Sequence, residues 1–482
     1  MRPHLDVLSQ EEKAQIHARS LALLRETGLR VESQEARQVL REAGARVDEA
    51  ARRVWLGESL VESALQGCPR RFALGGRRAG WSLAMNGGGC TLCADGTGIH
   101  VLDARTGARR RATEVDWQSA TRLIDALDDI GVYWTMVDPG LSKSDPAEAV
   151  RFWRQVFSLF SKHVQDSIDS PNEATWLLEV MQIVFGSREA IERDHPFSFL
   201  FCPVSPLILE GPATDACLSV LDWDVPIAVM PMPLMGATAP ANLSSTLLLA
   251  NAEVLATLAL IQSARPGTPC LYAPAPSVVN PRSWRYSGGE IEHALLGAAV
   301  TEMARFYGLP AESSSGGTDQ PTLGLQSGYE TALNWAMPML SWPDILVGPG
   351  LIDGSTVLSL EQILIDVEIF RRGVRMNRGI GGGPTDWLDG WIQDAGPGTG
   401  YAGQRRTRDA LRAGEWYRSS LGHHGTYERW LAAGKPALLD EARARVNKIV
   451  GEHQPQPISL EAVRALDQLE ARVRDLPPAV AR

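Results

Sequence analysis

Between residues 130 and 375 the chain repeats one unit, in which a short apolar strand leads into a loop of proline, glycine and serine and then into a helix. Seven such units are visible, with strands expected at residues 131–137, 163–165, 197–201, 227–230 and 270–272, from residue 309, and at 344–347. Continuously apolar strands indicate a parallel sheet that is covered on both faces. Seven units, with an eighth that is harder to see, predict an α/β fold of the (β/α)8 TIM-barrel type rather than an open sheet.

The regions on either side of this repeat have a different character. Residues 1–125 are predicted to form an extension of helices and β-hairpins, because Ser9 and Glu12 make a capping box and residues 90–107 alternate around glycines. We expect the barrel core over residues 126–380, and over residues 381–482 a helical segment that packs on the barrel. The chemistry is therefore expected on a central barrel with two appendages.

Composition argues against several kinds of partner. The net charge of −10 over 482 residues disfavours binding to nucleic acid or to an anionic membrane. No apolar run approaches the roughly 20 residues of a membrane span, and the richest stretch, residues 243–261, contains Asn251 and Glu253 and is predicted to be a buried helix. Six scattered cysteines are typical of reduced thiols, so we expect a cytoplasmic protein.

The predicted strand exits lack the usual catalytic motifs. No HxH, HExxH or cysteine-rich set is present, and the pair Cys90 and Cys93 has no second pair to complete a zinc site, so no catalytic metal is expected. The sequence contains no GxGxxG after a strand, no P-loop and no GxSxG elbow. The barrel mouth is therefore predicted to hold and orient a ligand rather than to attack it.

Several sequence blocks occur together and in order. They are residues 202–207 (Cys-Pro-Val-Ser-Pro-Leu), 230–240 (Met-Pro-Met-Pro-Leu-Met-Gly-Ala-Thr-Ala-Pro), 249–256 (Leu-Ala-Asn-Ala-Glu-Val-Leu-Ala), 265–269 (Arg-Pro-Gly-Thr-Pro) and 326–330 (Gln-Ser-Gly-Tyr-Glu). These blocks resemble the trimethylamine methyltransferase family, and the resemblance extends over nearly the whole chain.

The resemblance implies a barrel enzyme that removes a methyl group from a methylated amine. It implies that the acceptor is the Co(I) corrinoid (cobalamin) of a separate cognate protein that docks over the barrel mouth, so no tightly bound cofactor is expected. Archetypal members carry pyrrolysine and act on trimethylamine. This chain has only standard residues and is similar to the non-pyrrolysine branch, which includes glycine betaine methyltransferases. Whether the protein also forms a homo-oligomer stays open.

The resemblance and the strand exits together select the candidate site residues. Asp319 and Glu330 are the expected catalytic residues. The expected substrate-binding residues are Gln326, Tyr329, Tyr272, Met232 and Ser314. A quaternary ammonium leaves as a neutral amine, so a mouth without a general base suffices, and aromatic faces and oxygens should surround the cation. Each candidate also has a structural alternative, such as a helix-capping role for Glu330 and a core position for Tyr272.

The chain departs from the family pattern at the same exits. It has Gln320 and Pro321 where many relatives have Ser-Lys, Gly324 where they have Asp, and it lacks two C-terminal histidines. Two other functions therefore stay open, a methyltransferase that uses another acceptor such as tetrahydrofolate, and a non-catalytic protein that binds methylated amines.

Overall fold

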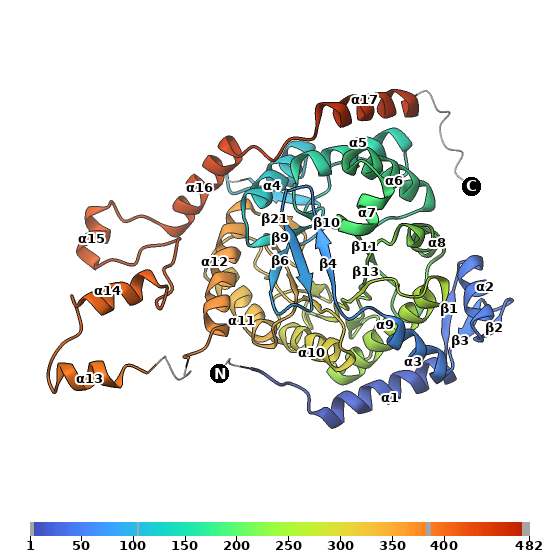
Figure 1. The fold of residues 1–482 in the computed structure, drawn as a ribbon, viewed down its shortest axis with the longest axis horizontal. Helices are drawn as coiled ribbons and strands as arrows, with labels where there is room; N and C mark the ends of the chain where they lie inside the picture. The colour runs from blue at the N-terminus through green and yellow to red at the C-terminus, as the bar shows by residue number, and fades with distance from the viewer. Residues whose placement is uncertain (1–3, 104–105, 382–386, 475–482) are drawn as a thin grey trace.

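The computed structural model describes residues 4–103, 106–381 and 387–474. Its centre is an eight-stranded parallel barrel with the helices arranged around it (Figure 1). The barrel strands, in chain order, are β6 (Thr91–Cys93), β9 (Ile130–Tyr133), β10 (His163–Asp166), β11 (Phe197–Phe201), β13 (Ile227–Val229), β15 (Cys270–Tyr272), β18 (Glu312–Ser314) and β19 (Ile345–Val347). A parallel bridge between Tyr272 and Ala311 joins β15 to β18 and closes the sheet. The predicted TIM-type barrel is confirmed.

A helix follows each barrel strand. These helices are α4 (Glu114–Ala126), α5 (Pro146–Leu159), α6 (Pro171–Phe185), α8 (Gly211–Val220), α9 (Leu243–Ala264), α10 (Ile291–Tyr307), α11 (Leu325–Ser341) and α12 (Leu360–Asn377), with the shorter α7 (Arg188–Asp194) and the 3-10 turn η1 (Leu221–Trp223) between them. Polar N-caps define several starts, as where the Asp145 side chain accepts from the Glu148 amide ahead of Pro146.

The barrel begins earlier in the chain than residue 126. Its first strand is β6, which contains Cys93 and pairs in parallel with both β19 and β9. Only three residues long, β6 is followed at once by a second extended segment, so the sequence around it resembles a run of hairpins. The hairpin itself forms downstream, where β7 (His100–Leu102) pairs antiparallel with β8 (Arg109–Arg111).

The remaining N-terminal residues form a small layer against the barrel. It contains α1 (Gln10–Glu26), α2 (Gln34–Glu42), α3 (Glu58–Gly67), β1 (Leu29–Val31), β2 (Arg46–Asp48), β3 (Arg53–Trp55), β4 (Phe72–Gly75) and β5 (Ser82–Met85). β1 pairs in parallel with β12 (Ile208–Leu209), and the buried Lys13 ammonium lies 2.9 Å from the Glu302 carboxylate of α10. The layer is therefore fixed to the barrel through both a sheet and an ion pair.

Helix α9 is long and apolar enough to cross a membrane by length and composition, but 83% of its most apolar window is buried inside the protein. It packs against α1 and α3, and Asn251 in its middle accepts a hydrogen bond from the Tyr272 hydroxyl. The predicted buried helix is confirmed.

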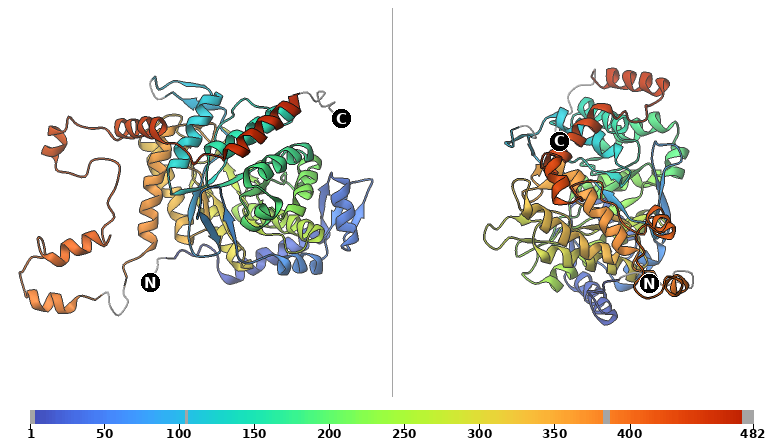
Figure 2. Two further views of the ribbon diagram at one scale, coloured as in Figure 1. Left: turned by 45° about the horizontal axis from the view of Figure 1, so that its top comes forward. Right: turned by 90° about the vertical axis from the view of Figure 1, so that its left-hand side faces the viewer.

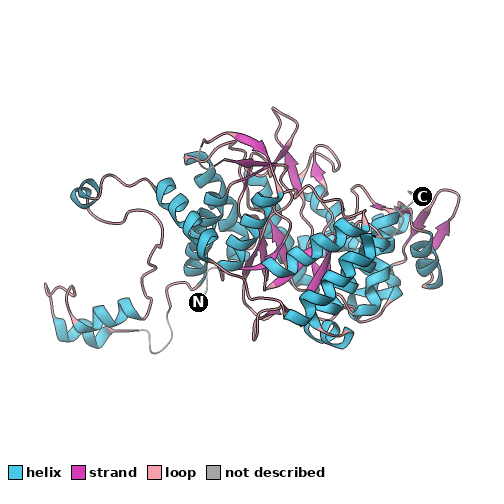
Figure 3. Cartoon of the chain, turned by 90° about the horizontal axis from the view of Figure 1, so that it is seen from above, coloured by secondary structure: helices cyan, strands magenta, loops and turns pink. Residues whose placement is uncertain are grey.

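The C-terminal residues divide into an arm and two packed helices. Helices α16 (Leu438–Glu452) and α17 (Leu460–Arg474) pack on α12, α4, α5 and α6. Between α12 and α16 the chain leaves the barrel as an extended arm with α13 (Asp389–Ala395), α14 (Arg405–Arg412) and α15 (Tyr427–Ala432), visible on the left of Figures 1 and 3 and in the first view of Figure 2. None of these three arm helices buries a residue.

Gly316 tests how tightly the β18 exit is packed. A methyl group added there would lie 1.5 Å from the Trp335 indole nitrogen, whereas one added at Gly328, on α11, would meet nothing within 4 Å. We expect Gly316→Ala to lower the free energy of unfolding by about 1–3 kcal/mol through overpacking, and Gly328→Ala to raise it by up to about 1 kcal/mol through helix propensity. Urea denaturation measures both, and equal effects would contradict the packing described.

Candidate active site

The candidate site lies at the carboxyl ends of the barrel strands. Two small sheets follow these ends, one of β14 (Leu234–Met235), β16 (Ser277–Val279) and β17 (Tyr286–Ser287), the other of β20 (Leu351–Ile352), β21 (Val357–Leu358), β7 and β8. In (β/α)8 enzymes this end of the barrel carries the active site. Among the residues that the structure describes, no group of three or more His, Cys, Asp or Glu side chains could hold a metal ion.

Asp319 holds two strand exits together. Its Oδ2 accepts from the Ser287 hydroxyl at 2.5 Å, and its Oδ1 accepts from the backbone amides of Gly288 and Gly289 at 3.0 and 3.2 Å. Ser287 ends β17 and the two glycines follow it, so Asp319 joins the β15 exit to the β18 exit. Both carboxylate oxygens are occupied, and the geometry assigns Asp319 a positioning role.

Glu330 fixes the same loop from the helix side. Its Oε2 accepts from the Thr318 hydroxyl at 2.5 Å and from the Asp319 amide at 3.0 Å, while Gln326 donates to its Oε1 at 2.7 Å. The structure thus brings together three residues that the sequence singled out, Asp319, Gln326 and Glu330. Their polar atoms bind one another and the backbone, so they support the mouth from beneath its surface.

The other candidates lie in three different environments. Tyr329 is 57% exposed near the start of α11, where it lines a groove together with Ile365 and Leu438. Tyr272 is fully buried between the barrel and α9, and its hydroxyl donates to Asn251 at 2.8 Å, so it belongs to the helix layer rather than to the mouth. Met232 is 51% exposed just past β13, and Ser314 is half-buried at the end of β18, so both remain at the mouth.

The sequence interpretation missed Glu312, at the start of β18. The Ser313 hydroxyl donates to the carbonyl oxygen of Gly297 on α10, so Ser313 faces the helices. Because neighbouring residues of a strand point to opposite faces, Glu312 and Ser314 point into the barrel. Glu312 is completely buried. An acid in a buried parallel strand is unusual, and that signal was available in the sequence.

Gln165 of β10 is the hydrogen-bond partner of Glu312. Its amide nitrogen donates to Glu312 Oε2 at 3.2 Å and to the Ser198 hydroxyl at 3.0 Å. Its amide oxygen accepts from the Trp134 indole nitrogen at 2.6 Å. The Gln165 side chain is therefore fixed at both ends, whereas Glu312 Oε1 has no hydrogen-bond partner.

Burial controls the ionisation of this interior. It raises the pKa of Glu312 to about 8, against the opposing effect of the Gln165 hydrogen bond. Burial also raises the pKa of the Cys202 thiol to about 12 and that of Cys93 well above its usual value, and in both cases the Glu312 carboxylate adds to the rise. These thiols are therefore protonated at neutral pH and are poor nucleophiles.

Two other buried acids of the mouth, Asp95 and Asp166, have hydrogen-bond donors on both of their carboxylate oxygens. Asp95, just past β6, accepts from the Gly96 amide at 2.9 Å and from the Ser355 hydroxyl at 3.3 Å, while burial raises its pKa to about 7. Asp166 accepts from the Thr135 hydroxyl and from the Ser167 amide. Glu312 is therefore distinguished from these two acids by an oxygen without a donor.

The barrel strands carry no lysine or arginine side chains. The eight strands, all of which the structure describes, contain no lysine or arginine. In the described exits, Lys143 lies 3.2 Å from the Glu173 carboxylate and donates to the Ser167 carbonyl, and the arginines, among them Arg109 and Arg285, are exposed. The interior thus holds acidic side chains with no lysine or arginine on its strands, and burial lowers the pKa of the one histidine of these strands, His163 on β10, to about 3.

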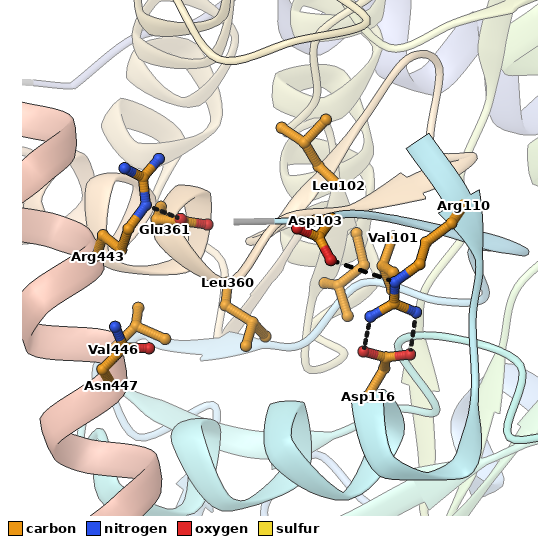
Figure 4. Close-up of a pocket in the computed structure, with 11 residues that line it drawn as sticks. Val101, Leu102, Asp103, Arg110, Asp116, Leu360, Glu361, Arg443, Val446 and Asn447 are labelled. Carbon is orange, nitrogen blue, oxygen red and sulfur yellow. Dashed lines mark hydrogen bonds and ion pairs between the residues drawn. The ribbon is translucent and has the colours of Figure 1, made fainter. Parts of the chain in front are cut away.

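A separate cavity of about 250 Å³ lies beside α16, between that helix, the start of α12 and the β7–β8 hairpin (Figure 4). Arg110 forms an ion pair with Asp116 there at 2.6 Å, and Arg443 lies 3.3 Å from Glu361. These charged groups of the cavity are therefore paired with one another.

A model of the trimethylamine methyltransferase (MTTB) family matches residues 1–476. The chain belongs to this family. It is 27% identical to the trimethylamine methyltransferase MttB of Desulfitobacterium hafniense (strain DSM 10664 / DCB-2) over 468 residues, which cover 97% of this chain and 94% of the relative. It is also 27% identical to the glycine betaine methyltransferase of D. hafniense (strain Y51), with 95% of each chain covered.

A solved structure agrees with the fold. The hydroxylamine complex of MtmB superposes with a TM-score of 0.50 over 98% of this chain and 93% of that one, at 11% sequence identity. At that identity the likeness supports the barrel architecture and nothing finer.

The positioning role of Asp319 predicts a loss of stability. Asp319→Ala leaves the Ser287 hydroxyl and the Gly288 and Gly289 amides without their acceptor, so we expect the free energy of unfolding to fall by about 1–3 kcal/mol. The matched control is Asp394→Ala, since Asp394 is exposed on α13 of the arm. Urea denaturation of both variants measures this loss, and equal stabilities would contradict the positioning role of Asp319.

Proposed function

We propose that this protein transfers a methyl group from a quaternary or tertiary methylated amine to the Co(I) corrinoid of a cognate partner protein in the cytoplasm. Membership of the trimethylamine methyltransferase family supports methyl transfer from a methylated amine. The names of the two D. hafniense relatives support both a tertiary and a quaternary donor.

The observation that carries the proposal is the incompletely bonded carboxylate of Glu312. A buried ionised carboxylate is stable only with a compensating charge or a full set of hydrogen bonds. Glu312 has one donor, Gln165, and a second oxygen without any. A methylated ammonium ion supplies the missing positive charge, and it makes no demand for further hydrogen-bond acceptors if it is quaternary.

The neighbouring groups suit such a cation. Trp134 is linked to Glu312 through Gln165, so an indole ring lies in the same network. A methylammonium group over an aromatic face gains about 0.5–2 kcal/mol. Because a quaternary donor leaves as a neutral amine, the protein has to orient it and exclude water, and the corrinoid supplies the nucleophile.

The surface near the mouth suits a docking partner. Met232 just past β13 and Trp284 between β16 and β17 are 51% and 70% exposed. Large exposed apolar side chains are typical of surfaces that a partner covers. They support docking of the corrinoid protein at this end, with the donor bound deeper, beside Glu312.

Methyl transfer to reduced cobalamin tests the proposal. Each of a panel of methylamines and betaines is incubated with the protein and reduced cobalamin, and the loss of the Co(I) absorbance is followed. We expect at least one donor to react, and Glu312→Gln to lower kcat/KM about tenfold or more, since a hydrogen bond to a charged group contributes roughly 1.5–3 kcal/mol.

Asp394→Asn, on the exposed arm, is the control and should react like the parent chain. Transfer to tetrahydrofolate but not to cobalamin would identify tetrahydrofolate, and not the corrinoid, as the methyl acceptor. A donor that raises Tm without any transfer would identify a binding protein instead.

A further inference from the structure

We propose that the donor is a methylated ammonium ion whose other substituents are uncharged, and that Glu312 selects it over zwitterionic donors such as betaines. This inference rests on the proposed function and narrows its substrate class. It follows from two features of the barrel interior, a carboxylate oxygen without a partner and the lack of a lysine or arginine on the eight strands to receive a second carboxylate.

The first feature favours a net positive ligand. Glu312 is fully buried, and its Oε1 has no hydrogen-bond donor. The nearby Asp166 accepts from Thr135 and Ser167, so both of its carboxylate oxygens have a donor. A cation placed beside Glu312 gains an ion pair that no described side chain now makes with that carboxylate.

The second feature penalises a zwitterion. Its carboxylate would have to be buried in an interior with Glu312, Asp95 and Asp166 and without lysine or arginine in any of the eight strands. Among the basic residues of the described exits, Lys143 is paired with Glu173, and Arg285 is exposed and lies 3.9 Å from the Asp353 carboxylate. Burying an anion without a partner is strongly unfavourable.

Isothermal titration calorimetry with choline and glycine betaine tests the selection, because both carry a trimethylammonium group and only betaine carries a carboxylate. We expect choline to bind at least tenfold more tightly. Glu312→Gln should weaken choline at least tenfold and change betaine little, while Asp394→Asn on the arm should change neither. Tighter binding of betaine would overturn the inference and leave the proposed function intact.

The pH dependence supplies a second readout. Burial raises the pKa of Glu312 to about 8 in the free protein, and a cation binds the ionised form. Below pH 8 binding must release a proton, so choline affinity should fall about tenfold for each pH unit toward pH 6, and Glu312→Gln should remove this slope. A slope that survives the substitution would contradict the role of Glu312. If no methylated amine binds or reacts, the proposed function itself fails.

The arm carries a second and independent inference, that it seats on another copy of this chain. Apolar side chains on and beside its first helix face solvent, among them Ile380 at 100%, Trp387 at 70% and Ile392 at 62% exposure. The barrel carries an apolar groove of about 540 Å³ along the start of α11, where Leu325 is 93% and Tyr329 57% exposed. We infer that the arm of one copy covers this groove of the other.

Position and charge both favour a second copy as the occupant. The arm projects from the side of the barrel that carries α11 and α12 (Figure 1), and residues of both helices line the groove. Helix α14 has the sequence RRTRDALR, with four arginines and one aspartate, in a chain whose net charge is −10. A basic arm is attracted to an acidic body.

Light scattering after size exclusion tests the exchange on the full chain. We expect a dimer, and monomers both for Leu325→Ser with Tyr329→Ser in the groove and for Trp387→Ser with Ile392→Ser on the arm, each with an unchanged circular dichroism spectrum. Val115→Ser, at a 69% exposed site on α4, should remain a dimer. A monomeric parent chain, or a dimer that survives either pair of substitutions, would overturn the inference.

Discussion

A carboxylate inside a closed barrel needs either a proton or a positive charge, and this requirement at Glu312 organises the site. Gln165 satisfies one of its oxygens and is itself fixed by Trp134 and Ser198. The other oxygen has no donor, and burial raises the pKa of the group to about 8. The free protein therefore stores an unfavourable arrangement that a cation relieves, and such a site prefers ligands that bring charge.

The surrounding loops keep that arrangement in place. Asp319 binds the Ser287 hydroxyl and two amides of the preceding exit, and Glu330 binds Thr318 and the Asp319 amide. Glu312 lies on β18, which leads into this loop. The hydrogen bonds of Asp319 and Glu330 therefore hold the backbone that follows Glu312 in place. In the proposed site the buried Glu312 contacts the ligand, whereas Asp319 and Glu330 hold the backbone at the barrel mouth in place.

The sequence predicted the barrel because seven strand–helix units leave a strong apolar repeat, and it missed β6 because three residues in a hairpin-like context leave almost none. The candidate site was predicted only in part. Asp319, Gln326 and Glu330 lie together at the β18 exit, but the local sequence does not show that their oxygens are already bonded. Tyr272 and Glu312 depend on strand phase, since a shift of one residue exchanges the barrel interior for the helix layer. That phase is fixed by cross-strand register, such as Val229 opposite Tyr272, which is not local in sequence.

The most direct test of this account is a crystal structure with tetramethylammonium bound at saturation. The account predicts the ligand inside the barrel, in contact with Glu312 Oε1 and within about 6 Å of the Trp134 ring centroid, the range of a cation–π contact. Tetramethylammonium bound elsewhere, with an ordered water satisfying Glu312 Oε1, would contradict it.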